Sequence, residues 1–171
     1  LLRYGAQGAR LNPGALLEMT EQVRAQAGLG LLQLDHVNVS SAARFPVEDL
    51  HRLHDTLVRG QRHEYLWVNL GVETANGRLL ASGRCRGKLH PFKPDQWEGA
   101  CREAIENLLT AGFTPMISLM FGLPGETPND IARTLRLVED LHECRLVIFP
   151  LFLAPMQPEQ KPFTIEDMTP L

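Results

Sequence analysis

The sequence predicts an α/β fold in which crossover helices cover a parallel sheet. Amphipathic stretches alternate with short apolar runs, so that a helix is followed by a strand four times along the chain. The strand-like runs are almost continuously apolar, which is typical of parallel strands that are buried on both faces. They recur at intervals of about 30 to 50 residues, the spacing that βαβ units require.

The helix boundaries follow from proline, glycine and capping residues. Asn12 is expected to cap a helix that has Pro13 at its first position. In the last helix, Thr127 is the cap, and Asp130 completes a capping box with Asp in place of Glu. The four predicted helices begin at Pro13, Pro46, Pro94 and Pro128, and the first three end near Gly28, Gly60 and Gly112.

Four apolar runs are predicted to be the strands, and they lie within one domain of residues 1–155. The segment after them, residues 156–171, contains too much Pro and Gln for regular structure, and we expect an irregular tail that leads to a missing segment. The predicted strands cover residues 29–39, 65–72, 114–121 and 146–153.

Composition excludes several classes of protein. A net charge of −3 gives no positive field to attract nucleic acid. No apolar run is long enough to span a membrane, and no secretory signal is visible. The three cysteines fit no disulfide framework and no metal-binding spacing, and their odd number suits a reducing cytosol, so we expect a cytoplasmic protein. Because the chain begins at Leu1 without Met and stops at Leu171, we also expect a fragment.

Polar or glycine-rich segments follow the first three predicted strands directly. Ligands of parallel α/β folds bind at the carboxyl ends of the strands, so these segments predict one ligand-facing rim. Glu73 is a candidate for a buried carboxylate that binds hydroxyl or amino groups, although a salt bridge to a neighbouring Arg or Lys would explain it as well. The segments are residues 35–41, 71–74 and 122–127, and residues 150–155 follow the fourth strand.

The motifs at this rim resemble those of radical S-adenosylmethionine (SAM) enzymes. The matching residues are Asn69-Leu70-Gly71-Val72-Glu73-Thr74, Gly87-Lys88, Ala111-Gly112-Phe113, Phe121-Gly122-Leu123-Pro124-Gly125-Glu126-Thr127 with Asp130 and Thr134, and Phe149-Pro150-Leu151-Phe152 with Ala154-Pro155. The resemblance spans residues 29–155. It is closest to the branch that often carries a cobalamin-binding domain ahead of the barrel.

The resemblance implies a partial (βα)6 TIM-like barrel with about four of its six units. Such enzymes hold a 4Fe–4S cluster that takes an electron from an external donor and cleaves SAM to a 5′-deoxyadenosyl radical, which then acts on a small-molecule or macromolecular substrate. By position, the implied cofactor contacts are Glu73 and Thr74 at the ribose or methionyl part, Gly122, Leu123 and Pro124 at the adenine, and Asp35, His36, Asn38 and Ser40 from the preceding strand. Arg44 is either a partner for a carboxylate or a surface residue.

The sequence departs from the family pattern in one respect that matters for activity. The Cys-x3-Cys-x2-Cys motif that ligates the cluster is absent, and so is the Gly-Gly-Glu-like segment that grips the cofactor's amino group. Both would lie upstream of Leu1, so the cluster ligands are expected outside this chain, and no catalytic residue is assigned within it. We expect the isolated chain to be inactive and to leave an apolar face of the sheet without its covering layer. We also expect it to be marginally stable or to associate through the sheet edge that precedes Leu29.

Two other functions remain open from the residues alone. The first is a non-radical α/β-barrel lyase with Glu73 as acid or base, which a Schiff-base lysine at a strand end would favour. Lys88, Lys93 and Lys161 are all expected in loops away from strand ends, which counts against it. The second is a non-catalytic domain that binds a nucleotide or a partner through the same rim.

Overall fold

The computed structural model describes residues 11–26, 28–62, 65–82 and 84–154. Within these ranges the strands form one sheet in the order β1-β2-β3-β4, and all three neighbouring pairs are parallel. This confirms the predicted α/β fold with a parallel sheet. The strands are β1 (His36–Val37), β2 (Trp67–Glu73), β3 (Thr114–Phe121) and β4 (Val147–Phe152).

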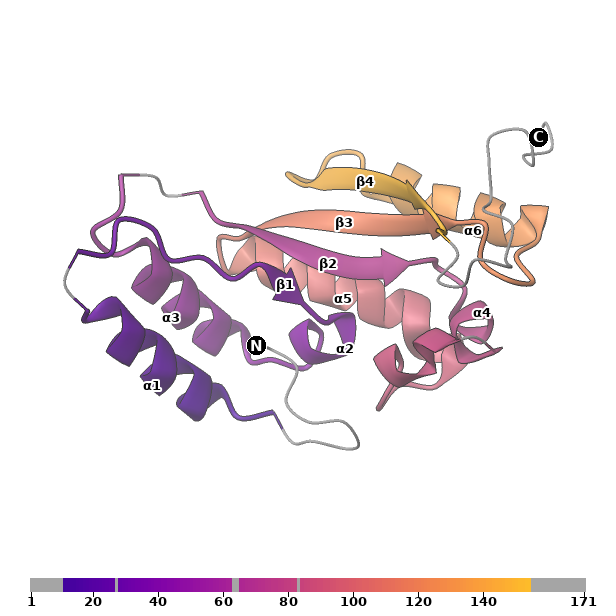
Figure 1. The fold of residues 1–171 in the computed structure, drawn as a ribbon. Coiled ribbons are helices and arrows are strands. Elements are labelled where there is room, and N and C mark those ends of the chain that lie inside the picture. The colour runs from indigo at the N-terminus through magenta and orange to yellow at the C-terminus, as the bar shows by residue number, and fades with distance from the viewer. Residues whose placement is uncertain (1–10, 27, 63–64, 83, 155–171) are drawn as a thin grey trace.

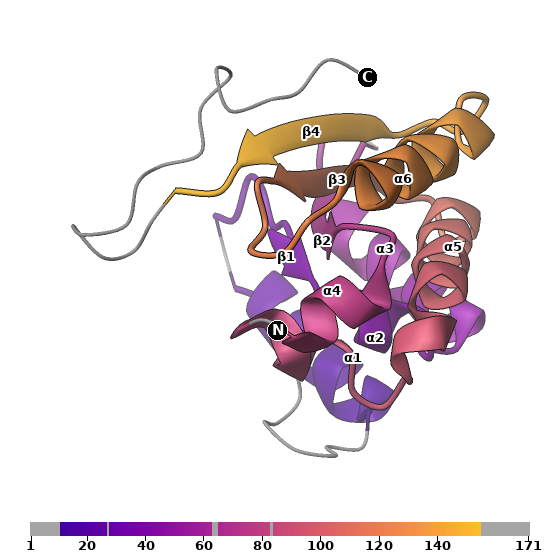
Figure 2. The ribbon, with the colours of Figure 1, turned by 90° about the vertical axis from the view of Figure 1, so that its right-hand side faces the viewer.

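Helices connect the strands and lie on one side of the sheet, as Figures 1 and 2 show. They are α1 (Pro13–Arg24), α2 (Val39–Ala42), α3 (Val47–Val58), α4 (Gly77–Ser82), α5 (Trp97–Thr110) and α6 (Pro128–Asp140), with 3-10 helices η1 (Arg84–Lys88) and η2 (Pro94–Gln96). Of these, α2, α4 and η1 were not predicted. They are too short to show a hydrophobic period in the sequence.

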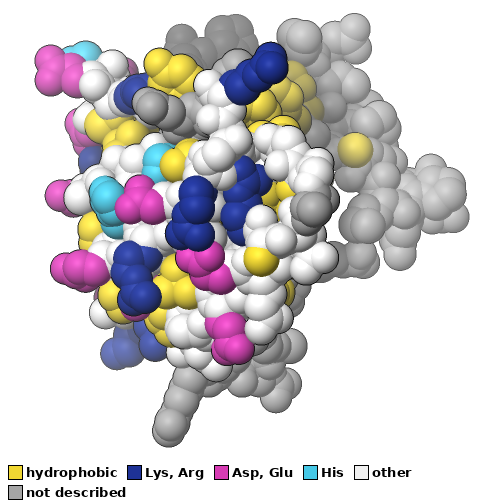
Figure 3. Space-filling view, turned by 90° about the vertical axis from the view of Figure 1, so that its left-hand side faces the viewer, with side chains coloured by type: hydrophobic (Ala, Val, Ile, Leu, Met, Phe, Trp, Pro, Cys, Tyr) yellow, Lys and Arg dark blue, Asp and Glu magenta, His cyan; other side chains and the backbone are white. Residues whose placement is uncertain are grey.

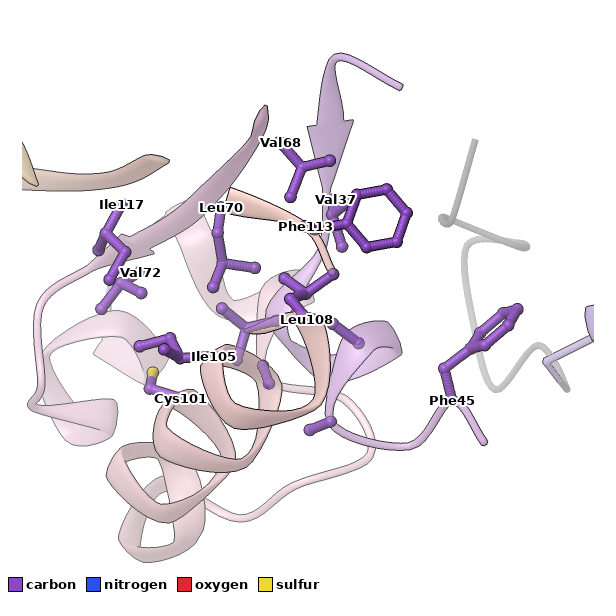
Figure 4. Packing of buried hydrophobic residues seen from close by; sticks show 14 of the residues in the cluster. Val37, Phe45, Val68, Leu70, Val72, Cys101, Ile105, Leu108, Phe113 and Ile117 are labelled. Carbon is purple, nitrogen blue, oxygen red and sulfur yellow. The ribbon is translucent and has the colours of Figure 1, made fainter. Parts of the chain in front are cut away.

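The main core lies between the sheet and α5. Alternate residues of β2, together with Ile117 of β3, point toward one face of that helix (Figure 4). None of these side chains is more than 1% exposed, so the packing fixes which face of each strand is buried. The residues are Val68, Leu70, Val72, Ile117, Cys101, Ile105 and Leu108.

The opposite face of the sheet is not covered by any described element. Trp67, Val147 and Phe149 are 47%, 44% and 50% exposed there. The described residues therefore cover only one face of strands whose apolar sequence is typical of burial on both faces. An apolar run shows that a strand can be buried, but it does not show how many layers cover it. Association through the exposed strand edges stays a prediction.

The predicted boundaries are confirmed where capping chemistry defines them. Asn12 Oδ1 accepts a hydrogen bond from Ala15 N at 3.1 Å, and α1 begins at Pro13 as expected. The bounds of β3 match the prediction of 114–121. The first strand is much shorter than the predicted 29–39, because only His36 and Val37 pair with β2. The predicted irregular tail, residues 156–171, lies outside the described residues.

Ion pairs join the helices at the surface. Arg59, directly after α3, contacts Glu21 of α1 at 2.8 Å, and Arg133 of α6 contacts Glu98 of α5 at 2.7 Å. On the face shown in Figure 3, positive and negative side chains lie next to one another instead of forming a patch of one sign. None of the helices in the described ranges has the length and apolar character needed to cross a membrane.

Candidate functional site

A cavity of about 650 Å³ opens on the uncovered face of the sheet, toward the carboxyl ends of the strands. Figure 2 views the molecule from the side toward which the strands run. The strand positions in the cavity wall alternate with those packed on α5, so the two faces of one sheet have separate roles. The lining residues are His36, Val37, Asn38, Asn69, Gly71, Glu73, Lys88, Ser118, Met120, Phe149 and Leu151.

An ion pair between Glu73 and Lys88 lies in the wall of this cavity. Lys88 Nζ donates to Glu73 Oε1, and the side chains are 34% and 8% exposed, respectively. Gly71 provides the room for this contact. A Cβ atom at Gly71 would lie 2.7 Å from Lys88 Nζ and 2.9 Å from Glu73 Oε1. The pair therefore depends on a glycine two residues before the carboxylate.

The backbone of Glu73 adopts a conformation that L-residues rarely take. Its φ is 63°, and the pairing register with β3 shifts between Gly71 and Glu73. A left-handed conformation costs a non-glycine residue about 1–2 kcal/mol. Such strain is common where a functional side chain must point in a particular direction. Here it accompanies a buried carboxylate that lines a cavity.

A buried hydrogen-bond network holds the chain directly after Glu73. Thr74 Oγ1 lies 3.2 Å from Thr134 Oγ1 of α6, and the Thr74 carbonyl accepts from Trp97 Nε1 of α5 at 2.9 Å. Asn76 Nδ2 donates to Asp130 Oδ1 of α6 at 2.5 Å. The Thr74 side chain is thus used in joining the end of β2 to α6, and Thr74 is not among the residues that line the cavity.

The predicted residues of the first strand fall into two groups. His36 and Asn38 line the cavity. Asp35 adjoins it through His36, whose Nδ1 lies 2.6 Å from Asp35 Oδ2. Ser40 is buried, and its hydroxyl donates to the carbonyl oxygen of Lys88. Ser40 therefore positions η1 behind the cavity instead of facing it.

The glycine-rich loop after β3 makes its polar contacts within the protein. Gly122 has a φ of 81°, and its N–H donates to Glu126 Oε2 at 2.7 Å. Burial raises the pKa of Glu126, and hydrogen bonds from the Gly122 and Leu123 amides offset part of this increase. Gly122, Leu123 and Pro124 follow β3 directly, but they do not line the cavity as the described residues define it.

The structure bears on the predictions made for Arg44 and for the lysines. Arg44 is exposed in a second depression, together with Glu103, and it does not line the cavity of Glu73. The expectation that Lys88 lies away from the strand ends is wrong, because η1 folds back and brings Lys88 to the end of β2. Lys93 is exposed, and Lys161 lies outside the described residues.

Several lining residues were missed by the sequence analysis. Asn69 was quoted only as part of a motif, and Ser118 and Met120 were treated as ordinary strand residues. All three occupy the strand positions that alternate with core residues, so the period of two along β2 and β3 was the available signal. Starting from Glu73, this period identifies Asn69 and Gly71 directly.

The residues that the structure describes form no metal site. Nowhere among them do three His, Cys, Asp or Glu side chains come together as a metal site. Cys101 is fully buried, and burial raises the pKa of its thiol. The described residues therefore do not fit a 4Fe–4S cluster. Comparison of the chain with protein-family models and with curated proteins finds no match.

The capping box of α6 predicts a pH dependence of stability. Burial alone would raise the pKa of Asp130, but hydrogen bonds from the hydroxyl and amide of Thr127 and from Asn76 outweigh it and lower the pKa. A carboxyl whose pKa is lower in the folded state stabilises the fold above its unfolded-state pKa, and this is lost as the pH falls through the folded-state value. Asp130→Asn should lower the free energy of unfolding at neutral pH by about 1 kcal/mol.

Urea unfolding of Asp130→Asn at several pH values tests this. As the pH falls below about 4, the ordinary pKa of an unfolded aspartate, the variant should lose less stability than the wild type, whose folded-state carboxylate takes up its proton only at lower pH. Asp95→Asn, which changes an exposed aspartate, is the matched control and should alter stability by less than about 0.5 kcal/mol. Equal effects of the two substitutions would contradict the assigned role of Asp130.

The strained backbone of Glu73 predicts that a glutamate at this position lowers the free energy of unfolding, and that its role is functional instead of structural. Glu73→Gly should be about 1 kcal/mol more stable than Glu73→Ala, because only glycine adopts this φ without strain. Relief of strain should also leave Glu73→Gly no less stable than the wild type, since the partly exposed Lys88 can turn to water. Thermal and urea unfolding measure both differences. A loss of about 3 kcal/mol in Glu73→Gly, typical of a broken buried ion pair, would instead show a structural role.

Proposed function

We propose that this chain is part of the core of a radical SAM enzyme and binds SAM over the Glu73–Lys88 pair. The observation that carries the proposal is a carboxylate and an ammonium group held side by side in a cavity at the carboxyl ends of parallel strands. Ligands of α/β sheets bind at this end. The resemblance of residues 69–74 and 121–127 to the family supports the choice of SAM.

The chemistry of the pair suits the polar groups of the SAM molecule. SAM carries ribose hydroxyls, and its methionyl part has an α-ammonium and an α-carboxylate. Glu73 can accept hydrogen bonds from a hydroxyl or an ammonium group, and Lys88 can donate to a carboxylate. Because Glu73 is almost fully buried, hydrogen bonds to its charge are stronger there than they would be at an exposed surface.

Other residues of the cavity have supporting roles in this proposal. Asn38, Asn69 and Ser118 supply polar groups near the pair, whereas Met120 and Phe149 give an apolar surface for a base. Gly122, Leu123 and Pro124, at the end of β3, remain the predicted contacts of the adenine. Thr74 would help to position Glu73 without contacting the ligand, since the Thr74 hydroxyl shares a hydrogen bond with the hydroxyl of Thr134.

The iron–sulfur cluster is not assigned to this chain. The described residues offer no ligand set for it, so its ligands would lie outside the chain, and no step of the reaction is derived through it. The same proposal includes a (βα)6 barrel completed by further units, an external electron donor and a cytoplasmic location. In the branch that the resemblance favours, cobalamin would be bound by a separate domain.

One observation favours a second candidate function, that of a lyase with a Schiff-base lysine. Lys88 Nζ lies at the end of β2 beside the Glu73 carboxylate, and a lysine at a strand end is the feature that would favour a lyase of this kind. In this alternative the neutral amine of Lys88 adds to a substrate carbonyl, and water leaves as the imine forms. Glu73 would then act as the acid and base that transfers protons during the addition and the loss of water.

Binding of SAM to the chain tests the first candidate. Equilibrium dialysis should show binding that Glu73→Gln and Lys88→Met each weaken by about tenfold or more, as expected for hydrogen bonds to charged groups. Glu106→Gln and Lys93→Met change exposed residues outside the cavity and serve as matched controls. Absence of binding, or equal affinity in all four variants, would contradict the proposal.

The same variants separate the two candidates. Incubation with pyruvate and borohydride should leave Lys88 unmodified, as measured by mass spectrometry of its tryptic peptide. A reduced adduct on Lys88 that is absent in Lys88→Met would favour the lyase. Lys93 provides the internal control for nonspecific reduction.

A further inference from the structure

We propose that His36 is an acid–base group for the ligand of the cavity, and that Asp35 and Asn69 are the residues that position it. The inference goes beyond binding, because it assigns a proton-transfer role. It rests on the proposed function only for the identity of the ligand. Three contacts carry it: two hydrogen bonds between Asn69 of β2 and Asp35, which directly precedes β1, and one contact between Asp35 and His36.

Asn69 holds Asp35 through two hydrogen bonds. The backbone N–H of Asn69 donates to the carbonyl oxygen of Asp35 at 2.7 Å. The side-chain Nδ2 of Asn69 donates to Asp35 Oδ1 at 2.8 Å. The first bond belongs to the parallel pairing of the two strands, and the second fixes the carboxylate. Asp35 is therefore oriented although its side chain is 71% exposed.

The second oxygen of Asp35 is directed at His36. Asp35 Oδ2 lies 2.6 Å from His36 Nδ1, a distance at which Nδ1–H donates to the carboxylate. A hydrogen bond at one ring nitrogen determines which nitrogen carries the proton in the neutral imidazole. The proton is then on Nδ1, and Nε2 has the lone pair. His36 lines the cavity, so this nitrogen is available to a ligand there.

Stability does not explain this arrangement. The side chains of His36 and Asp35 are 77% and 71% exposed, and ion pairs at such a surface contribute almost nothing to folding. In enzymes, an imidazole is activated by a carboxylate that orients it, as Asp35 orients His36. Here the carboxylate is in turn held by Asn69. The cavity brings this group together with the Glu73–Lys88 pair.

The proton transfer balances without any added reagent. His36 Nε2 accepts a proton from a hydroxyl or ammonium group of the ligand, and the electron pair of the broken bond stays on the ligand oxygen or nitrogen. Asp35 stabilises the imidazolium that forms. Since His36 is exposed, the proton then passes to water, and the reverse sequence makes His36 an acid. The other charged groups that line the cavity are Glu73 from β2 and Lys88 from η1.

This mechanism defines the chemical class of the ligand. The group next to the reacting centre must carry an exchangeable proton on oxygen or nitrogen, as an alcohol or an amine does. His36 is the catalytic group in this proposal, since it touches the ligand. Asp35 and Asn69 act through His36.

The position of the proton on the ring can be measured directly. Two-bond 1H–15N correlation spectra of the neutral form should show His36 with its proton on Nδ1. Asp35→Asn should shift it to Nε2. Asp55→Asn removes the carboxylate next to His51 and is the matched control, so it should leave the His36 signals unchanged. A wild-type His36 with its proton on Nε2 would overturn the proposal.

Chemical modification tests whether the ligand covers His36. Diethyl pyrocarbonate should modify His36, and Asp35→Asn should reduce the rate by about half or more, because the nucleophilic nitrogen then carries the proton. Saturating SAM should abolish the reaction at His36 and leave the exposed His90 unaffected. Unchanged modification of His36 in a chain that binds SAM would overturn its assignment to the ligand.

The two readouts separate this inference from the proposed function. If SAM does not bind but the proton is on Nδ1 only when Asp35 is present, the choice of SAM fails and the acid–base group stands. If SAM binds and His36 shows neither the predicted tautomer nor protection, the acid–base role fails and the binding proposal stands.

Discussion

Hydrogen bonds of Thr74 and Asn76 hold the turn after β2, directly after Glu73. Thr74 and Asn76 are bonded to α6, and the Thr74 carbonyl is bonded to Trp97 of α5. The residues that make these bonds directly follow the end of β2 at Glu73, where φ is positive. Consecutive residues therefore serve two sides of the sheet: Thr74 joins the layers, and Glu73 faces the cavity. Strain at one residue is balanced by satisfied polar groups at the next.

One-sided packing of the sheet has a second consequence. Because α5 covers the face of Val68, Leu70 and Val72, the alternate positions of the same strands are left to form the cavity wall. The wall is divided in composition, because the charged pair comes from β2 and η1, whereas the lining side chains of β3 and β4 are apolar apart from Ser118. A ligand with a charged or hydroxylated part and an apolar part matches this division. SAM has both.

The start of α6 and the position of Glu73 were predictable from the sequence, because both depend on residues that are close together in the chain. The capping box of Thr127 and Asp130 defines the start of α6 through side chains three residues apart, and both partners are visible in the sequence. The position of Glu73 at a strand end follows from the apolar run before it. Lys88 was not predicted at the cavity, since it reaches Glu73 through a 3-10 helix that has no sequence period. The direction of the Thr74 side chain depends on a partner 60 residues away, which no local pattern reports.

The central claim is that a ligand binds on the uncovered face of the sheet, at the Glu73–Lys88 pair. Backbone amide chemical shifts measured during addition of SAM test it most directly, because they report every position of the chain at once. The account predicts saturable shifts at the ends of β1, β2 and β3 and in η1, and none in the depression around Arg44 and Glu103. Shifts confined to that depression, or no shifts at all, would contradict the account.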